Sequence, residues 1–400
     1  MRNSLRASPR NALRNTLRNT LRNHLCTALR TALRAAPPVP MRVALVGVVL
    51  AACLGATDAL CAGRSKRVTA ANATKDNGAE LAAYGRRDDV LRFAAEVAAR
   101  GELPQDWVEA QVARARYVPS VARLIAPPPA GSAKNWAAYR ARFVERERIA
   151  AGVAFWRANA DALARAEETF GVPAAIVAGV IGVETYYGRV MGDFRIIDAL
   201  ATLAFDFPTT RRDRSAFFRD ELEQLLLLSH REGLDPVALK GSYAGAMGLA
   251  QFMPGSINRH AIDFDGDGRV DLASSAADAI GSAANYLANF GWQRGMPTHY
   301  SVAVPVEVVD RAVLLAPDIL PSFTAAEFAE RGAVLDAAGR AHEGAMALVE
   351  LQNGDAAPSY VAGTRNFYTV TRYNWSSYYA MAVIELGEAV ARAWRETGAR

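Results

Sequence analysis

The 400-residue chain is poor in cysteine, and its only three, Cys26, Cys53 and Cys61, lie within the first 61 positions. If a leader is cleaved beyond Cys61, the mature protein has no thiol. Such a protein has no disulfide framework, no cysteine-ligated metal and no cysteine nucleophile. Its stability and chemistry must therefore come from other side chains.

Acidic residues and lysine are absent from residues 1–42, which hold nine arginines. Removing these nine charges from the formal net charge of +5 leaves about −4 for the rest of the chain. The high pI therefore belongs to the leader and gives no reason to expect nucleic-acid binding by the body. The overall composition, 51% hydrophobic and 22% charged, is that of a globular protein with two or three packed units.

Within residues 1–40 an arginine recurs at every fourth position over a long stretch. We interpret this stretch as a translated leader without function, with Met41 as the true start; an amphipathic membrane helix is the alternative. The apolar run at 43–54 follows a short positive segment and is typical of a secretory signal. It is short for a membrane span.

Two cleavage sites remain open after this signal. The tetrapeptide Leu50-Ala51-Ala52-Cys53 resembles a bacterial lipobox, in which Cys53 is acylated and becomes the mature N-terminus. An ordinary signal peptidase site near Ala62 is the second reading, and an uncleaved membrane anchor is the third. All three place the body of the protein in the cell envelope, and the first would anchor it to the outer membrane.

Periodicity divides the body into helical regions and one β-rich segment. Helical spacing is clear at 136–170, after Pro173, at 215–231, at 276–290 and at 376–394. After Pro297 come short pieces typical of strands, among them SVAVPVEVVD, GAVLD, MALVELQ and NFYTVTRYN. The fold class expected is mainly α (α+β), organised as a leader and signal segment (1–62), a flexible linker (63–86), a helical domain (87–170), a core with an acidic loop (171–296), a small β domain (297–370) and a C-terminal segment and helix that complete the core (371–400).

One carboxylate stands on an otherwise apolar helix face. On the helix after Pro173, Glu184 shares a face with Val177, Val180 and Ile181, because residues three and four apart are neighbours. A carboxyl group in such a place stays protonated with a raised pKa, as a general acid for glycosidic cleavage requires. The spacing alone leaves open a structural alternative, in which Glu184 pairs with Arg189 at the helix end.

Several long motifs around Glu184 occur in a fixed order. They are KNWAAYRARFVERERIAAGVAFW, GVETYYG, RVMGDFRIIDALATLAFDFP, KGSYAGAMGLAQFMP, DFDGDGRVDL, ADAIGSAANYL and NFYTVTRYNWSSYYAMAV. Together they resemble the membrane-bound lytic murein transglycosylase B family, over about 88–394. The resemblance implies a lysozyme-like catalytic core with a helical domain and a small β domain.

The resemblance also implies the site residues. Glu184 matches the family's catalytic glutamate, and the residues that match its sugar-contacting positions are Ser242, Gln251, Tyr286, Tyr373, Asn374 and Tyr379. Tyrosine offers an apolar face to a sugar ring and a polar tip, and amides offer donor and acceptor. One departure is PTTRRDRSAFF (208–218), which is longer than the family pattern, so which of its arginines faces substrate stays open.

The acidic loop at 263–271 resembles an EF-hand calcium loop. Position 12 is Ser274 where glutamate is expected, and a longer loop closing on Asp278 would supply the missing carboxylate. Sodium, or a solvated turn without an ion, is the alternative. The expected ligands of a structural calcium ion are the side chains of Asp263, Asp265, Asp267 and Asp278 and the carbonyl of Arg269.

Most glycosidases use two carboxylates, but no second one stands out near Glu184, since neither Asp193 nor Asp198 has an apolar setting in the sequence. The family implies that one glutamate cleaves the MurNAc–GlcNAc bond of peptidoglycan strands as acid and then base, leaving a 1,6-anhydro-MurNAc end and needing no cofactor. The rivals are a hydrolytic muramidase on the same fold and a non-catalytic peptidoglycan-binding scaffold. A calcium sensor would need a second EF-hand. We expect a periplasmic monomer.

Overall fold

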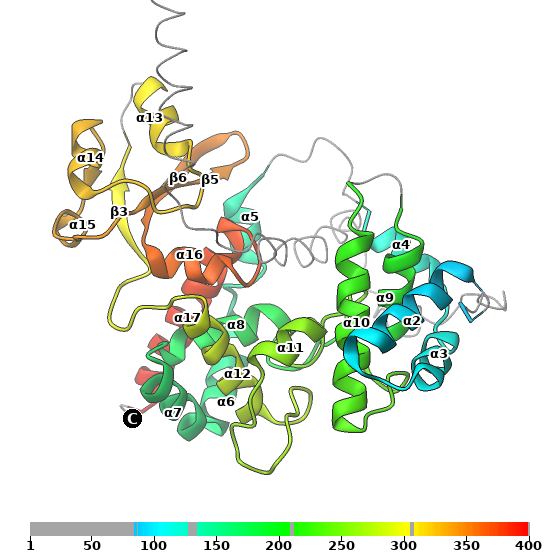
Figure 1. Cartoon of the computed structure of the whole chain (residues 1–400). Coiled ribbons are helices and arrows are strands. Elements are labelled where there is room, and N and C mark those ends of the chain that lie inside the picture. The colour runs from blue at the N-terminus through cyan, green and yellow to red at the C-terminus, as the bar shows by residue number, and fades with distance from the viewer. Residues whose placement is uncertain (1–83, 86, 127–133, 209–211, 305–307, 399–400) are drawn as a thin grey trace, which may run out of the picture. The chain divides into compact units, whose positions relative to one another are not determined.

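The computed structural model describes residues 84–85, 87–126, 134–208, 212–304 and 308–398 (Figure 1). The predicted leader and signal segment, including Cys53 and Ala62, lies outside the described residues. The predicted linker ends earlier than expected, because Tyr84 already belongs to the fold. Tyr84 is 2% exposed, and its hydroxyl donates to Asp206 Oδ2 at 2.6 Å.

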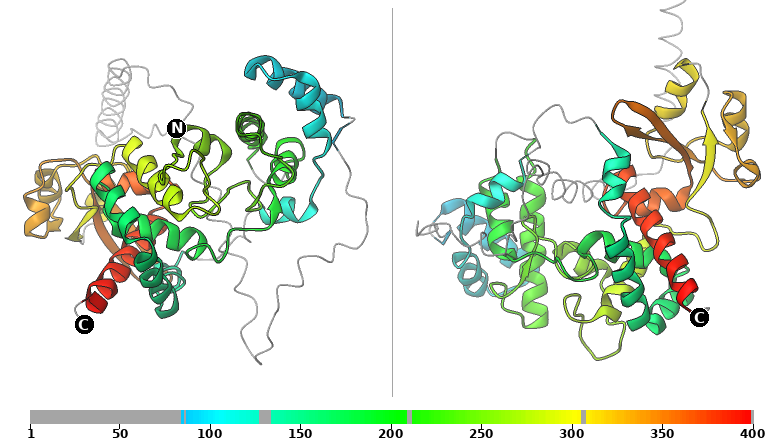
Figure 2. Two further views of the ribbon diagram at one scale, coloured as in Figure 1. Left: turned by 90° about the horizontal axis from the view of Figure 1, so that it is seen from below. Right: turned by 180° about the vertical axis from the view of Figure 1, so that it is seen from behind.

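A first group of helices comes from two separate parts of the sequence. Helices α9 and α10 lie side by side (Figure 2), α4 packs on α9, and α2 packs on α3. Phe205, at the end of α9, contacts the rings of Tyr84 and Phe93 and so connects the two parts. The bounds are α2 Asp88–Gly101, α3 Gln105–Ala113, α4 Pro119–Leu124, α9 Ile196–Phe205 and α10 Ser215–Glu232.

A second group surrounds α8, which is apolar on all sides and almost wholly buried, as expected of a central helix. Helix α17 packs against α8. A Cβ atom on Gly179 would lie 2.2 Å from Val383 O, and one on Gly387 would lie 2.0 Å from Ala175 O. Glycine is therefore required twice where the two helices cross. The bounds are α5 Trp136–Ala141, α6 Arg146–Ala158, α7 Ala160–Phe170, α8 Ala174–Thr185, α11 Pro254–His260, α12 Ala276–Asn289, α16 Arg365–Thr371 and α17 Ser377–Gly398.

This packing does not follow the predicted boundary after residue 170. Helices α6 and α7 pack on α17, α12 and α8, although they were assigned to the helical domain at 87–170. Helices α9 and α10 pack with the earlier group, although they fall in the range predicted for the core. Sequence order alone could not show this, because the chain leaves the second group after α8 and returns to it only at α11.

A small β domain follows α12. Its antiparallel sheet has the order β4-β3-β6-β5 and its own apolar core, which includes Leu314, Phe328 and Leu348. A separate two-stranded sheet pairs β1 with β2, with Phe194 opposite Gly241. The bounds are β1 Phe194–Arg195, β2 Lys240–Gly241, β3 His299–Ala303, α13 Val308–Leu315, α14 Ala325–Glu330, β4 Val334–Leu335, α15 Ala337–Arg340, β5 Ala347–Asn353 and β6 Ala356–Gly363.

The mainly helical fold class with small sheets is confirmed, but two of the predicted strand segments are partly helical. The end of SVAVPVEVVD, from Val308, begins α13. NFYTVTRYN was read as β-rich, whereas its first residues form α16. Thr364 caps this helix by accepting a hydrogen bond from Asn366 N at 3.1 Å, and Phe367 and Val370 are fully buried. A cap and an apolar interior thus override the strand preference of β-branched and aromatic residues.

Within the described ranges, no single helix combines the length and hydropathy needed to cross a bilayer. The pair α7 and α8, bent by 117°, meets the length and hydropathy criteria only when the two are counted together.

Candidate active site

Glu184 lies in the last turn of α8 and is half-buried, with its Oε2 atom shielded from solvent. Its Oε1 accepts a hydrogen bond from the Tyr379 hydroxyl at 2.6 Å, and its buried Oε2 has no hydrogen-bond partner among the described residues. Burial raises the pKa of Glu184 to about 8, and the Tyr379 hydrogen bond opposes this rise. The carboxyl group is therefore protonated at neutral pH, with one oxygen left for another molecule.

The apolar face predicted from the sequence is present, since Val177, Val180 and Ile181 are all fully buried. The structural alternative for Glu184 is not found. The Arg189 guanidinium lies 4.8 Å from the centroid of the Tyr186 ring, and no ion pair joins it to Glu184 in the described part of the chain.

Three of the predicted tyrosines lie together beside this carboxyl group. The rings of Tyr373 and Tyr379 are stacked, with centroids 6.3 Å apart, and Tyr286 lies 4.8 Å from Tyr373. The hydroxyl of Tyr373 donates to Ala250 O, and that of Tyr286 to Arg372 O, each at 2.8 Å. Only Tyr379 donates to the carboxyl group, so the other two hydroxyls hold backbone segments in place.

Of the predicted polar residues, Ser242 and Gln251 lie in the Gly-rich segment (240–254), and Asn374 lies near the start of the C-terminal segment (371–400). Ser242 Oγ accepts from Ala246 N at 3.0 Å, which leaves its own proton to donate. Gln251 Nε2 donates to Met191 O at 3.2 Å and to Gly248 O at 2.9 Å. Asn374 is 2% exposed, and its Oδ1 has no partner within the described ranges.

The backbone around Glu184 is unusual. Tyr186, Tyr187 and Gln251 have φ values of 52°, 57° and 48°, in the left-handed region that non-glycine residues seldom adopt. Such conformations persist only where the surroundings hold them, and they gather at functional sites. Thr185 lies in GVETYYG but was not predicted as a site residue. It is part of that support, because it is fully buried and donates to Leu249 O at 3.0 Å.

Among the described residues, neither Asp193 nor Asp198 is placed as a second catalytic carboxylate, although the expectation for Asp198 needs correction. Asp198 was expected to lack an apolar setting, yet it is 5% exposed on α9, and burial raises its pKa. It accepts from Arg116 N at 3.0 Å and pairs with Arg195 at 3.3 Å, so it is committed to joining α9 to the chain before α4. Asp193 is exposed. No charge on another described residue contributes to the raised pKa of Glu184.

The segment 208–218 departs from the family pattern, and its arginines take different positions. Arg211 lies outside the described residues, and Arg212 is exposed. The Arg214 guanidinium lies 4.9 Å and 5.6 Å from the ring centroids of Phe217 and Phe218, so it packs against the start of α10.

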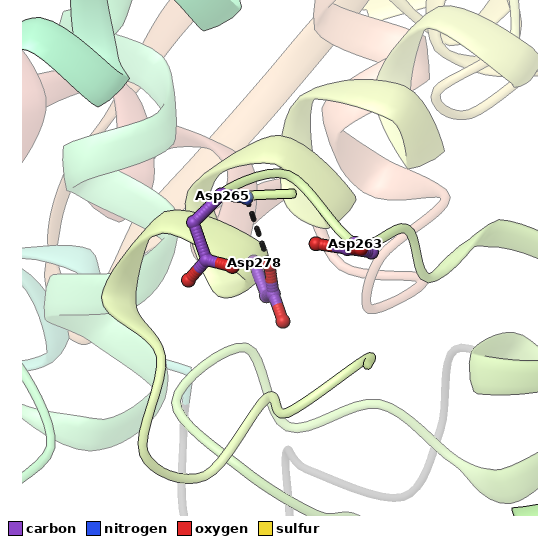
Figure 3. A group of neighbouring side chains, drawn as sticks. All are labelled: Asp263, Asp265 and Asp278. Atoms are coloured by element: carbon purple, nitrogen blue, oxygen red, sulfur yellow. Dashed lines mark hydrogen bonds between the residues drawn. The ribbon is translucent and has the colours of Figure 1, made fainter. Parts of the chain in front are cut away.

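The acidic loop gathers three of the four predicted aspartates. Figure 3 shows Asp263 and Asp265 in the loop facing Asp278 of α12, with carboxylate oxygens within 4.8 Å of one another. Asp278 is 1% exposed and accepts from Phe264 N at 2.7 Å and Asp271 N at 2.8 Å.

The fourth aspartate, Asp267, lies outside this group, and its Oδ1 accepts from Arg269 N at 2.9 Å. A set of carboxylate oxygens is what Ca²⁺ prefers, so the gathered residues fit that ion.

Comparison with known proteins gives matches over most of the chain. The sequence profile of the family described as Transglycosylase SLT domain matches residues 85–388. The chain is 42% identical over 290 residues to "Membrane-bound lytic murein transglycosylase B" of Escherichia coli (strain K12), covering 70% of this chain and 77% of that protein.

Two solved structures extend the likeness to the fold. The soluble lytic transglycosylase SltB1 from Pseudomonas aeruginosa has a TM-score of 0.69 and 38% identity, with 76% of this chain and 99% of that chain covered. The Escherichia coli lytic transglycosylase SLT35 in complex with calcium has a TM-score of 0.68 and 37% identity, with 78% and 95% covered.

Proposed function

Because the chain belongs to the transglycosylase SLT family and is a lytic transglycosylase acting on peptidoglycan, we propose that Glu184 is its single acid and base. The observation that carries this proposal is the shielded, protonated carboxyl group with one unpartnered oxygen, Oε2. A group with this pKa can give up a proton at neutral pH and take it back later in the same turnover.

In the first step Glu184 protonates the oxygen that joins C1 of MurNAc to C4 of GlcNAc, and the C1–O bond breaks. The acetamido oxygen of the same MurNAc bonds to C1 and stabilises the positive centre, as in substrate-assisted glycosidases. The absence of a second carboxylate beside Glu184 in the described residues supports this route over one with a protein nucleophile.

In the second step the Glu184 carboxylate takes the proton of the C6 hydroxyl, and O6 attacks C1. The bond from C1 to the acetamido oxygen breaks, and a 1,6-anhydro-MurNAc end forms without consumption of water. Tyr379 donates to Oε1, so in this mechanism it orients the carboxyl group while Oε2 gives up and takes back the proton.

Replacing Glu184 with glutamine tests this assignment on purified sacculi. Glu184→Gln should abolish release of anhydro-muropeptides, measured by mass spectrometry. The matched control is Glu221→Gln, which changes another buried glutamate of raised pKa on α10 and should keep activity. Retained activity in Glu184→Gln would sink the assignment. Products heavier by one water in the unmodified enzyme would instead favour the hydrolytic muramidase.

We also propose that Asp263, Asp265 and Asp278 hold a structural Ca²⁺, supported by the oxygen donor set and by the calcium complex of SLT35. The ion would neutralise three carboxylates and stiffen the loop, with no part in the bond-breaking steps. Anchoring through Cys53 and a periplasmic location remain proposals that rest on the sequence and on the membrane-bound relative.

A further inference from the structure

A cavity of about 610 Å³ lies away from Glu184, between the end of α10 and the acidic loop. Its apolar lining includes Leu228, Leu239, Met247, Ile257 and Leu272, of which four are at most 9% exposed. The volume is in the range of sites for small ligands and short peptides, roughly 300–1,000 Å³. Neither Glu184 nor any of the tyrosines beside it contributes to this lining.

Charges of both signs surround the apolar lining. Arg231 and Glu232 pair with each other at 2.7 Å. Lys240 and Arg269 also line the cavity and form no ion pair with another described residue, and the same holds for Asp193 and Asp271. A ligand that matches this lining has small apolar groups together with carboxylates and an amine.

The cavity adjoins the Gln251 side of the active site. Met191 and Gly248 line it, and their carbonyl oxygens accept the two hydrogen bonds from Gln251 Nε2. A substituent on a sugar held at Gln251 would therefore extend from the glycan strand beside the residues that line this cavity.

We propose that this cavity, here called the α10 pocket, binds the peptide stem carried by MurNAc; this rests on the proposed function. The stem is a short peptide with alanine methyl groups, free carboxylates and, in its diamino acid, a free amine. The apolar lining complements the methyl groups. Lys240 and Arg269 complement the carboxylates, and Asp193 and Asp271 complement the amine. The pocket would let the enzyme distinguish peptide-bearing strands from bare strands.

Binding of the free stem tests the α10 pocket without catalysis. The probe is the tetrapeptide L-Ala-γ-D-Glu-diaminopimelyl-D-Ala, titrated calorimetrically into the full-length Glu184→Gln protein. Lys240→Glu should weaken binding at least about tenfold, the scale of one lost charged contact. Ala238→Trp, which places a large ring at the pocket lining, should abolish it.

Matched controls are the charge reversal Arg92→Glu on α2 and the substitution Ala110→Trp on α3, both at exposed positions outside the lining. Each should bind the tetrapeptide like the parent. The proposal is overturned if the parent does not bind, if all four variants bind alike, or if tetra-alanine binds as tightly as the stem. Thermal melts of each variant show that it is folded.

A second measurement separates this proposal from the catalytic one. With Glu184 intact, the ratio of kcat/KM on peptide-bearing strands to kcat/KM on strands freed of peptide by an amidase should fall several-fold in Lys240→Glu and Ala238→Trp. An unchanged ratio counts against the α10 pocket, whichever residue catalyses. Activity that survives Glu184→Gln counts against the catalytic assignment, and the titrations still report on the pocket.

Discussion

Thr185, the residue after Glu184, donates from Oγ1 to Leu249 O at 3.0 Å, and it accepts from Gly188 N at 3.1 Å. Leu249 N in turn donates to Leu272 O, just beyond the acidic loop, at 2.7 Å. The end of α8 is thus hydrogen-bonded to the Gly-rich segment, and that segment is hydrogen-bonded to the residue after the acidic loop. Substitutions that break either hydrogen bond should therefore alter the position of Glu184.

Thr185→Val keeps the shape of the side chain but removes its hydroxyl. Leu249 O and Gly188 N would lose a partner in the interior, which costs about 1–3 kcal/mol of unfolding free energy. We expect a lower urea midpoint and a lower kcat with little change in KM, because Glu184 loses its support rather than a substrate contact.

The conservative variant Thr185→Ser retains the hydroxyl and is the control for this change. It should recover most of the kcat lost in Thr185→Val, even where its stability stays lower through loss of the methyl group. Equal kcat in the two variants would show that the hydroxyl has no positioning role.

Tyr379→Phe removes the hydrogen bond to Glu184 Oε1 and leaves the ring in place. That bond favours the charged carboxylate, so its loss raises the pKa of Glu184 above about 8. Activity requires the protonated acid and falls as pH rises through this pKa, so the alkaline limb of the kcat profile should move to higher pH. The maximal rate should fall roughly tenfold. An unshifted limb would contradict the assignment of that limb to Glu184.

Asp278→Asn tests the acidic loop as an ion site. The parent should gain thermal stability on addition of excess CaCl2, by about 2.7 kcal/mol at a hundredfold excess over Kd, and lose it with a chelator. The variant should lose the calcium response, together with one of the backbone contacts that Asp278 makes to Phe264 or Asp271. A calcium response of the parent's size in Asp278→Asn would exclude this residue as a ligand.

Glu221→Gln probes a buried carboxyl group that joins α10 to α11. Glu221 is 4% exposed and accepts from Gly255 N at 2.7 Å, and burial raises its pKa to about 7. The folded state therefore holds a proton that the unfolded state releases near pH 4.5, and stability falls as pH rises between these values.

Glutamine keeps the acceptor for Gly255 N and does not ionise. The variant should be more stable than the parent near pH 8, on the order of 1 kcal/mol, and similar to it near pH 5. Urea midpoints at the two pH values decide this. A variant that loses stability equally at both pH values would contradict the raised pKa of Glu221.

Candidate site residues could be proposed from the sequence because they lie in long contiguous motifs. The order of GVETYYG, the Gly-rich segment and the C-terminal segment predicted Glu184, Ser242, Gln251 and the tyrosines, and the structure places three of those tyrosines together beside Glu184. The hydrogen-bond partners of the Tyr373 and Tyr286 hydroxyls could not be predicted. They are the backbone carbonyls of Ala250 and Arg372, and a backbone carbonyl carries no sequence signal. The burial of Asp198 was missed for a similar reason, since its partners Arg116 and Arg195 depend on how α9 packs.

By itself, the sequence determined the mainly helical class, the single carboxylate on an apolar helix face and the family, because periodicity and motif order are local properties of the chain. Only the tertiary structure decided that α9 and α10 leave the core group, that Thr185 ties the end of α8 to Leu249, and that the Glu184 carboxyl group is shielded enough to remain protonated near neutral pH. A raised pKa depends on which atoms exclude water from the carboxyl group, and those atoms come from segments far apart in the chain.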